Sequence, residues 1–172
     1  YWCETASCQA DYDKSKKDGF FSIYGVTVDK KAGSKELLAI MVAISAVGRK
    51  FAEKSEKNET SAEAFREVYS GGVNFTFGSG PAGSSDHPNA GPGCVGVSSG
   101  GCTTSPTQID FWTMAGYGDT YGNELTRNIY NVVHELGHAY DYGHNYPSSA
   151  IPSAFAEERH RYLRPNGIDN YP

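Results

Sequence analysis

Residues 134–138 read His-Glu-Leu-Gly-His, and no other feature of the chain constrains its structure as strongly. Two histidines four residues apart on a helix project from one face, one turn apart, and can share a single metal ion. The glutamate that follows the first histidine is then placed to accept a proton from an attacking water. The pattern predicts a helix here, with His134 and His138 as zinc ligands and Glu135 as the catalytic residue.

The residues around this motif have the spacing of an amphipathic helix. Apolar residues recur three or four positions apart at Leu125, Ile129, Val132, Leu136 and Ala139. At about 100° per residue, both histidines lie roughly 160° from Leu136 around the helix axis. One face would then pack on the core and the other would line a cleft. Gly143 has the character of a helix-ending residue, so we expect the helix to span residues 125–142.

The length of 172 residues is sufficient for one domain with its own core, so we expect a single domain over residues 1–172. Aromatic and β-branched residues predict strands at 20–28, 73–77 and 108–114. The strand at 108–114, just before the histidine helix, is either an edge that binds peptide backbone or an ordinary sheet strand.

Helical spacing predicts a strongly apolar backing helix that Ser34 caps and that carries Leu37, Leu38, Met41, Ile44, Val47 and Phe51. Thr60 and Glu63 have the spacing of a capping box that opens a second, short helix. A last short helix is expected at 151–163. The predicted class is α+β, with a small mixed or antiparallel sheet packed on the backing helix and on the HExxH helix.

Two segments lack such patterns. Residues 1–19 predict an irregular N-terminal arm, and residues 78–107 a long loop. Each contains one pair of cysteines. The spacing excludes CxxC zinc motifs, and the even count favours two disulfides in an oxidising, extracellular compartment. We expect the local pairs Cys3–Cys8 and Cys94–Cys102, although four cysteines allow three connectivities.

Charge and hydropathy limit the partners. A net charge of −5 without a stripe of Lys and Arg argues against nucleic acid. No apolar run approaches the length of a membrane span, so no membrane is expected. The chain opens at Tyr1 without an initiator Met, which suggests a processed or excised piece. We expect a secreted monomer that acts on a protein or peptide.

A catalytic zinc takes three protein ligands and keeps one position open for water. Glu157 and Glu158 follow His138 by 19 and 20 residues, on the predicted C-terminal helix, which can fold back toward the histidines. We select Glu157 because Ala154 and Arg161 share its face, which places a small residue toward the histidine helix. Glu158 stays an alternative.

His144 is the other alternative for the third ligand. HExxHxxxxxH resembles the metzincin zinc signature, but Asp141 occupies the position of the metzincin glycine and no methionine follows His144. If the helix continues to residue 142, His144 lies about 9 Å along its axis from His138. We expect Asp141 to end the helix or to orient a ligand of the ion.

The HExxH followed by a glutamate about twenty residues later resembles the gluzincins, the thermolysin-type zincins, over residues 125–163. The run from Tyr24 through residues 64–69 to residues 131–139 also resembles small bacterial metallopeptidase-like domains beside extracellular repeat proteins. The first resemblance implies a zincin-like domain in which a second helix supplies a glutamate ligand.

These features together predict a secreted zinc metalloendopeptidase that cleaves peptide bonds with a metal-activated water. One alternative is a metal hydrolase that acts on another amide or ester. The other, from a different class, is a catalytically silent, zinc-stabilised binding or toxin module. A purely structural zinc would need four protein ligands and no water.

Overall fold

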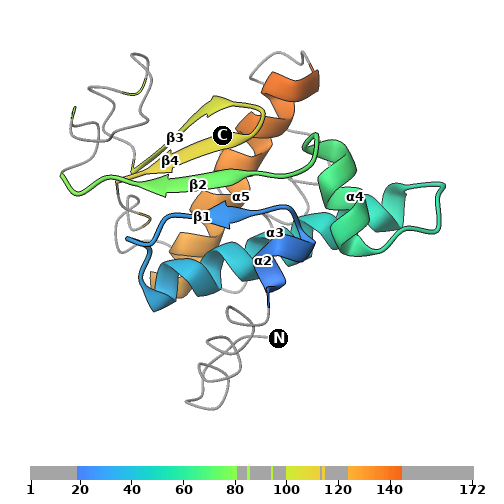
Figure 1. Cartoon of the computed structure of the whole chain (residues 1–172), viewed down its shortest axis with the longest axis horizontal. Helices are drawn as coiled ribbons and strands as arrows, with labels where there is room; N and C mark the ends of the chain where they lie inside the picture. Colours follow the sequence, from blue (N-terminus) through green and yellow to red (C-terminus); the bar gives the residue numbers. More distant parts are fainter. Residues whose placement is uncertain are drawn as a thin grey trace, which may run out of the picture.

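The structure is a computed structural model that describes residues 19–80, 85, 94, 100–112, 114 and 124–144. Within these ranges the chain forms four helices and one four-stranded mixed sheet, which confirms the predicted α+β class (Figure 1). In chain order the elements are α2 Phe20–Ile23, β1 Thr27–Val28, α3 Ser34–Lys54, α4 Ser61–Val68, β2 Asn74–Phe77, β3 Gly101–Ser105, β4 Gln108–Phe111 and α5 Glu124–His144.

The strands lie in the order β1-β2-β4-β3. The first three run parallel, whereas β3 is antiparallel to β4 and forms one edge of this sheet. Parallel neighbours need a crossover connection, and α3 with α4 supplies the one between β1 and β2. Helix α5 crosses behind the sheet in Figure 1 and contacts both β3 and β4. The sheet face toward the helices is apolar and carries Phe75, Phe77, Ile109 and Phe111.

Helix α3 is the backing helix that the apolar spacing predicts. It buries Leu37, Leu38, Ile44 and Val47, while Met41 and Phe51 pack against the same core. The predicted cap is wrong by one residue, because Gly33 is the N-cap and Ser34 is the first helical residue. Helix α3 contacts both α4 and α5, and therefore helps to support the histidine helix.

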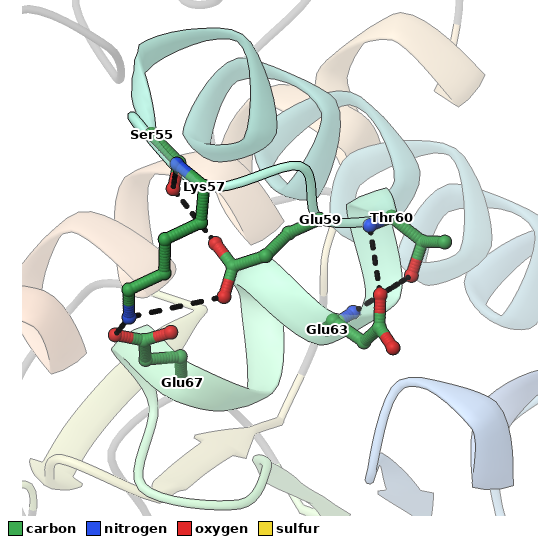
Figure 2. A network of polar contacts seen from close by, with 6 residues as sticks. All are labelled: Ser55, Lys57, Glu59, Thr60, Glu63 and Glu67. Carbon is green, nitrogen blue, oxygen red and sulfur yellow. Dashed lines mark hydrogen bonds and ion pairs between the residues drawn. The ribbon is translucent and has the colours of Figure 1, made fainter.

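The capping box at the start of α4 is confirmed. The Thr60 hydroxyl accepts from the backbone N–H of Glu63 at 3.3 Å, and the Glu63 carboxylate accepts from the backbone N–H of Thr60 at 2.8 Å (Figure 2). Beside it, Lys57 forms an ion pair with Glu67 and a looser one with Glu59 at 4.0 Å. Exposed ion pairs add little stability, so the capping box is the principal local determinant of this helix start.

The prediction of a strand over residues 20–28 is wrong for its first half, where α2 forms a single helical turn. This turn follows Gly19, which adopts a left-handed φ of 85°. The ring centroids of Phe20 and Tyr24 are 5.1 Å apart. A helical turn brings residues four apart together, whereas a strand separates them, so aromatic packing overrides the local β preference. Gly25, at φ 68°, then turns the chain into β1.

The prediction of a loop over residues 78–107 is wrong where β3 forms. This strand pairs with β4, which places the segment at 108–114 inside the sheet as an ordinary strand rather than a free edge. Cys102 of β3 forms a disulfide with Cys94, and their Cα atoms are 5.8 Å apart. The local pairing predicted for these two cysteines is confirmed.

Other predictions fall on residues outside the described ranges. These are the N-terminal arm with Cys3 and Cys8, and the C-terminal helix with Glu157 and Glu158. Among the helices that the structure does describe, none has the length and apolar character needed to cross a membrane.

Candidate active site

Helix α5 presents the HExxH motif. Its predicted apolar stripe is confirmed, with four fully buried members: Ile129, Val132, Leu136 and Ala139. His134 and His138, across the helix, are only half-buried. The helix continues through Gly143 to His144, so the expectation that Gly143 ends it is wrong.

The two histidine side chains converge on one point. The Nε2 atoms of His134 and His138 are 3.1 Å apart, and their ring planes are nearly perpendicular at 88°. Two nitrogen ligands of a tetrahedral zinc ion, each bonded at about 2.05 Å, are about 3.3 Å apart. The pair therefore fits two adjacent positions of one zinc ion with little rearrangement. The ring of Tyr130 stacks on His134 with 6.1 Å between the centroids.

Glu135 points from α5 toward the edge strand β3. Its side chain is buried, with 6% of the residue exposed. The hydroxyl of Thr103 lies 2.7 Å from the Glu135 Oε2 atom and 3.0 Å from the Glu135 backbone carbonyl oxygen. A carboxylate that accepts a hydroxyl hydrogen bond in a buried place has a defined orientation. The carboxylate beside the histidine pair is thus held by a second element of the fold.

Two opposing effects act on the acidity of Glu135. Burial disfavours the charged carboxylate and raises the pKa of Glu135 above its usual value. Hydrogen bonding from the Thr103 hydroxyl and the positive charge that His138 can carry act in the opposite direction. The net direction is upward. A raised carboxyl pKa brings the group nearer to neutral pH, where a proton acceptor and donor is most effective.

Sequence reasoning missed Thr103 and Gly101, which both approach Glu135. They are two residues apart on β3 and therefore share one face of the strand. A Cβ atom at position 101 would lie 3.1 Å from the Glu135 Oε1 atom. The absence of a side chain at Gly101 therefore leaves room for the Glu135 carboxylate beside β3. Thr103 precedes Glu135 by 32 residues, and no local pattern in the sequence connects the two.

Asp141 lies inside α5, which continues to His144. The expectation that Asp141 ends the helix is therefore wrong. Its side chain is buried, and neither carboxylate oxygen has a hydrogen-bond partner among the residues that the structure describes. Burial raises the pKa of Asp141, and nearby His138 partly offsets this. The second expected role, orienting a ligand of the ion, stays a prediction.

The described residues provide no third ligand beside His134 and His138. In the described ranges, no three His, Cys, Asp or Glu side chains gather closely enough to hold an ion. His144 remains helical, and its ring stacks on Tyr140 and contacts the Tyr140 carbonyl oxygen at 2.9 Å. Six residues along a helix separate it from His138 by about 9 Å and by about 120° around the axis. This position does not favour His144, and Glu157 and Glu158 fall outside the described ranges.

Comparison with known proteins identifies no family for this chain. No protein-family model, no curated protein and no solved structure matches this chain.

Proposed function

We propose that this chain is a secreted zinc-dependent endopeptidase. The observation that carries the proposal is the convergence of His134 and His138 to an Nε2 separation of 3.1 Å, with the buried Glu135 between them in sequence. This set contains two zinc ligands and one carboxylate suited to proton transfer. A fully buried, satisfied histidine pair would serve packing alone, but both imidazoles here are half-buried.

Each residue has a distinct role in the proposed reaction. His134 and His138 would hold the zinc ion, and Glu157 is the proposed third ligand. When bound, zinc lowers the pKa of water toward neutrality and polarises a substrate carbonyl. Glu135 would accept a proton from the attacking water and pass it to the leaving nitrogen of the peptide.

The edge strand supports a peptide as substrate. Strand β3 ends the described sheet and contacts α5, and its Thr103 touches the proposed base. An extended peptide can add to such an edge through backbone hydrogen bonds. A peptide-binding edge was one of two alternatives for residues 108–114, and we propose β3 for this role instead. The Cys94–Cys102 disulfide is compatible with the oxidising compartment of a secreted protein.

The test compares Glu135→Gln with the unchanged protein, by zinc content per chain and by cleavage of an unfolded, casein-like substrate. We expect one zinc per chain in both proteins. We expect kcat to fall roughly 10²- to 10⁴-fold in the variant, because the proton acceptor is lost. Glu124→Gln, which changes an exposed carboxylate on the same helix, is the matched control and should keep full activity.

The outcomes separate the alternatives. A fully active Glu135→Gln variant would refute the proposed mechanism. One zinc per chain with no cleavage of any unfolded protein would favour a silent binding or toxin module. Cleavage confined to small amides or esters would favour a different metal hydrolase.

The third ligand is tested separately with Glu157→Ala and Glu158→Ala. Loss of a ligand should lower zinc affinity, so zinc retention during dialysis against a weak chelator distinguishes the two positions. We expect Glu157→Ala to lose zinc and Glu158→Ala to retain it. The reverse result would move the ligand to Glu158.

A further inference from the structure

One face of the edge strand β3 lies against the carboxylate of the proposed base, Glu135. Thr103 places its hydroxyl 2.7 Å from Oε2 of Glu135, and the missing side chain of Gly101 leaves room for Oε1. A Cβ atom on residue 101 would lie 3.1 Å from Oε1 and would also meet the ring of Phe111. The carboxylate therefore accepts one hydrogen bond from β3 and occupies space that a side chain at position 101 would restrict.

The Thr103 hydroxyl has one proton and two acceptors within reach. They are the Oε2 atom and the backbone carbonyl oxygen of the same residue, Glu135, at 2.7 and 3.0 Å. When it is ionised, the carboxylate is the stronger acceptor of the two. Because the hydroxyl sits within reach of both the side chain and the backbone of Glu135, it restricts how the carboxylate can rotate relative to helix α5.

We propose that Thr103 is a positioning residue that orients the Glu135 carboxylate for proton transfer. This inference rests on the proposed function, because it assigns a partner to the general base of that reaction. Proton transfer is sensitive to the distance and angle between the base and the attacking water, and a misplacement of about 1 Å can reduce the rate about 100-fold. A base held by a packed, hydrogen-bonded neighbour keeps its productive geometry.

A structural role for Thr103 would give a different result. Removing any buried hydroxyl that donates to a carboxylate lowers stability, whether or not the carboxylate takes part in a reaction. The chain contains a matched example on the opposite face of the sheet, where the buried Thr76 hydroxyl donates to Asp110. Thr76→Val is therefore the control for the loss of a buried threonine–carboxylate hydrogen bond.

The experiment measures kcat, KM and zinc content of the zinc-loaded protein for Thr103→Val, Thr103→Ser and Thr76→Val. For Thr103→Val we expect kcat to fall roughly 10- to 100-fold, with KM and zinc per chain unchanged. Thr103→Ser, which keeps the hydroxyl, should stay within about threefold of the original kcat. Thr76→Val should lose stability without a comparable loss of kcat per folded molecule.

The outcomes also distinguish this proposal from the proposed function. If Glu135→Gln is inactive but Thr103→Val keeps the kcat of Thr76→Val, the positioning role is refuted and the proposed function stands. A Thr103→Ser variant as impaired as Thr103→Val would also refute it, since the hydroxyl would then be irrelevant. If Thr103→Val does not fold, Thr103→Ala is measured by the same readouts and the same criteria apply.

Discussion

The phenol of Tyr69, at the end of α4, donates a hydrogen bond of 3.0 Å to the backbone carbonyl of Leu136, inside the HExxH turn of α5. Both side chains are buried. Burial, and to a lesser degree Tyr140 and Asp141, raises the pKa of Tyr69 well above its usual value, so the phenol remains a donor at neutral pH. The contact joins the short helix to the middle of the proposed metal-binding turn.

We predict that Tyr69→Phe lowers the free energy of unfolding by about 1–2 kcal/mol, because a buried carbonyl loses a donor. Urea denaturation should show a lower midpoint with an unchanged m-value. Tyr142→Phe, which changes an exposed tyrosine of α5, is the control and should change stability by less than about 0.5 kcal/mol. Equal effects of the two substitutions would contradict the role of the Tyr69 hydrogen bond.

The capping box of α4 yields a second prediction. Thr60→Ala removes the hydroxyl that accepts from the Glu63 N–H and should destabilise the protein by about 1 kcal/mol. Thr60→Ser keeps the hydroxyl and should recover most of this loss. Thermal unfolding of the three proteins checks the order, and a Thr60→Ser variant as unstable as Thr60→Ala would contradict it.

Gly71 and Gly72 follow α4 with φ angles of 107° and 149°. A side chain at either position is strained, but only at Gly72 would a Cβ atom collide with the backbone carbonyl of Gly25; at Gly71 it would meet nothing within 4 Å. We therefore expect Gly72→Ala to be more destabilising than Gly71→Ala, with a loss above about 1 kcal/mol. Chemical denaturation of both variants measures the difference, and equal losses would show that the close approach is unimportant.

The buried carboxylate of Glu135 predicts a pH-dependent difference in stability in metal-free protein. Burial raises its folded-state pKa above the unfolded value, so the folded state binds the proton more tightly. The contribution of protonated Glu135 to the stability of the original protein is then lost as the pH rises from the unfolded pKa through the folded pKa. Glu135→Gln does not ionise, so its stability relative to the original protein should increase over that interval. Thermal unfolding from pH 4 to pH 8 with a chelator present tests this, and a constant difference would contradict it.

Metal binding should stabilise the fold through the histidine pair. At a free zinc concentration about 100 times Kd, the gain is about 2.7 kcal/mol. We expect this gain in the original protein and in Glu135→Gln, but not in His134→Ala or His138→Ala, as measured by thermal shift. Chelation should abolish activity with a modest loss of fold. Complete unfolding on chelation would instead indicate a structural zinc with four protein ligands.

Several elements were predictable because their signals are local. The spacing of His134 and His138 and the apolar residues of α5 follow from the helical period, and the partners in the Thr60 box are three residues apart. The strand at β2 has an alternating pattern of its own. In each case the side chains that interact are close in the chain, so the helix or strand geometry alone determines how they meet.

Other features depended on the tertiary structure. Strand β3 has little apolar alternation and is held by β4 and by the disulfide of Cys102. Residues 20–23 become helical because the ring of Phe20 packs against Tyr24. Asp141 is buried within α5 although its sequence position suggested a helix end.

The amino-acid sequence by itself determined which groups α5 presents for chemistry: two imidazoles and one carboxylate on a single turn. Only the tertiary structure decided how that carboxylate is held, because Thr103 reaches Glu135 from a strand 32 residues earlier. The physical reason is that local periodicity sets the direction of a side chain on its own helix. The contacts, burial and acidity of that side chain come from distant segments that meet only when the chain folds.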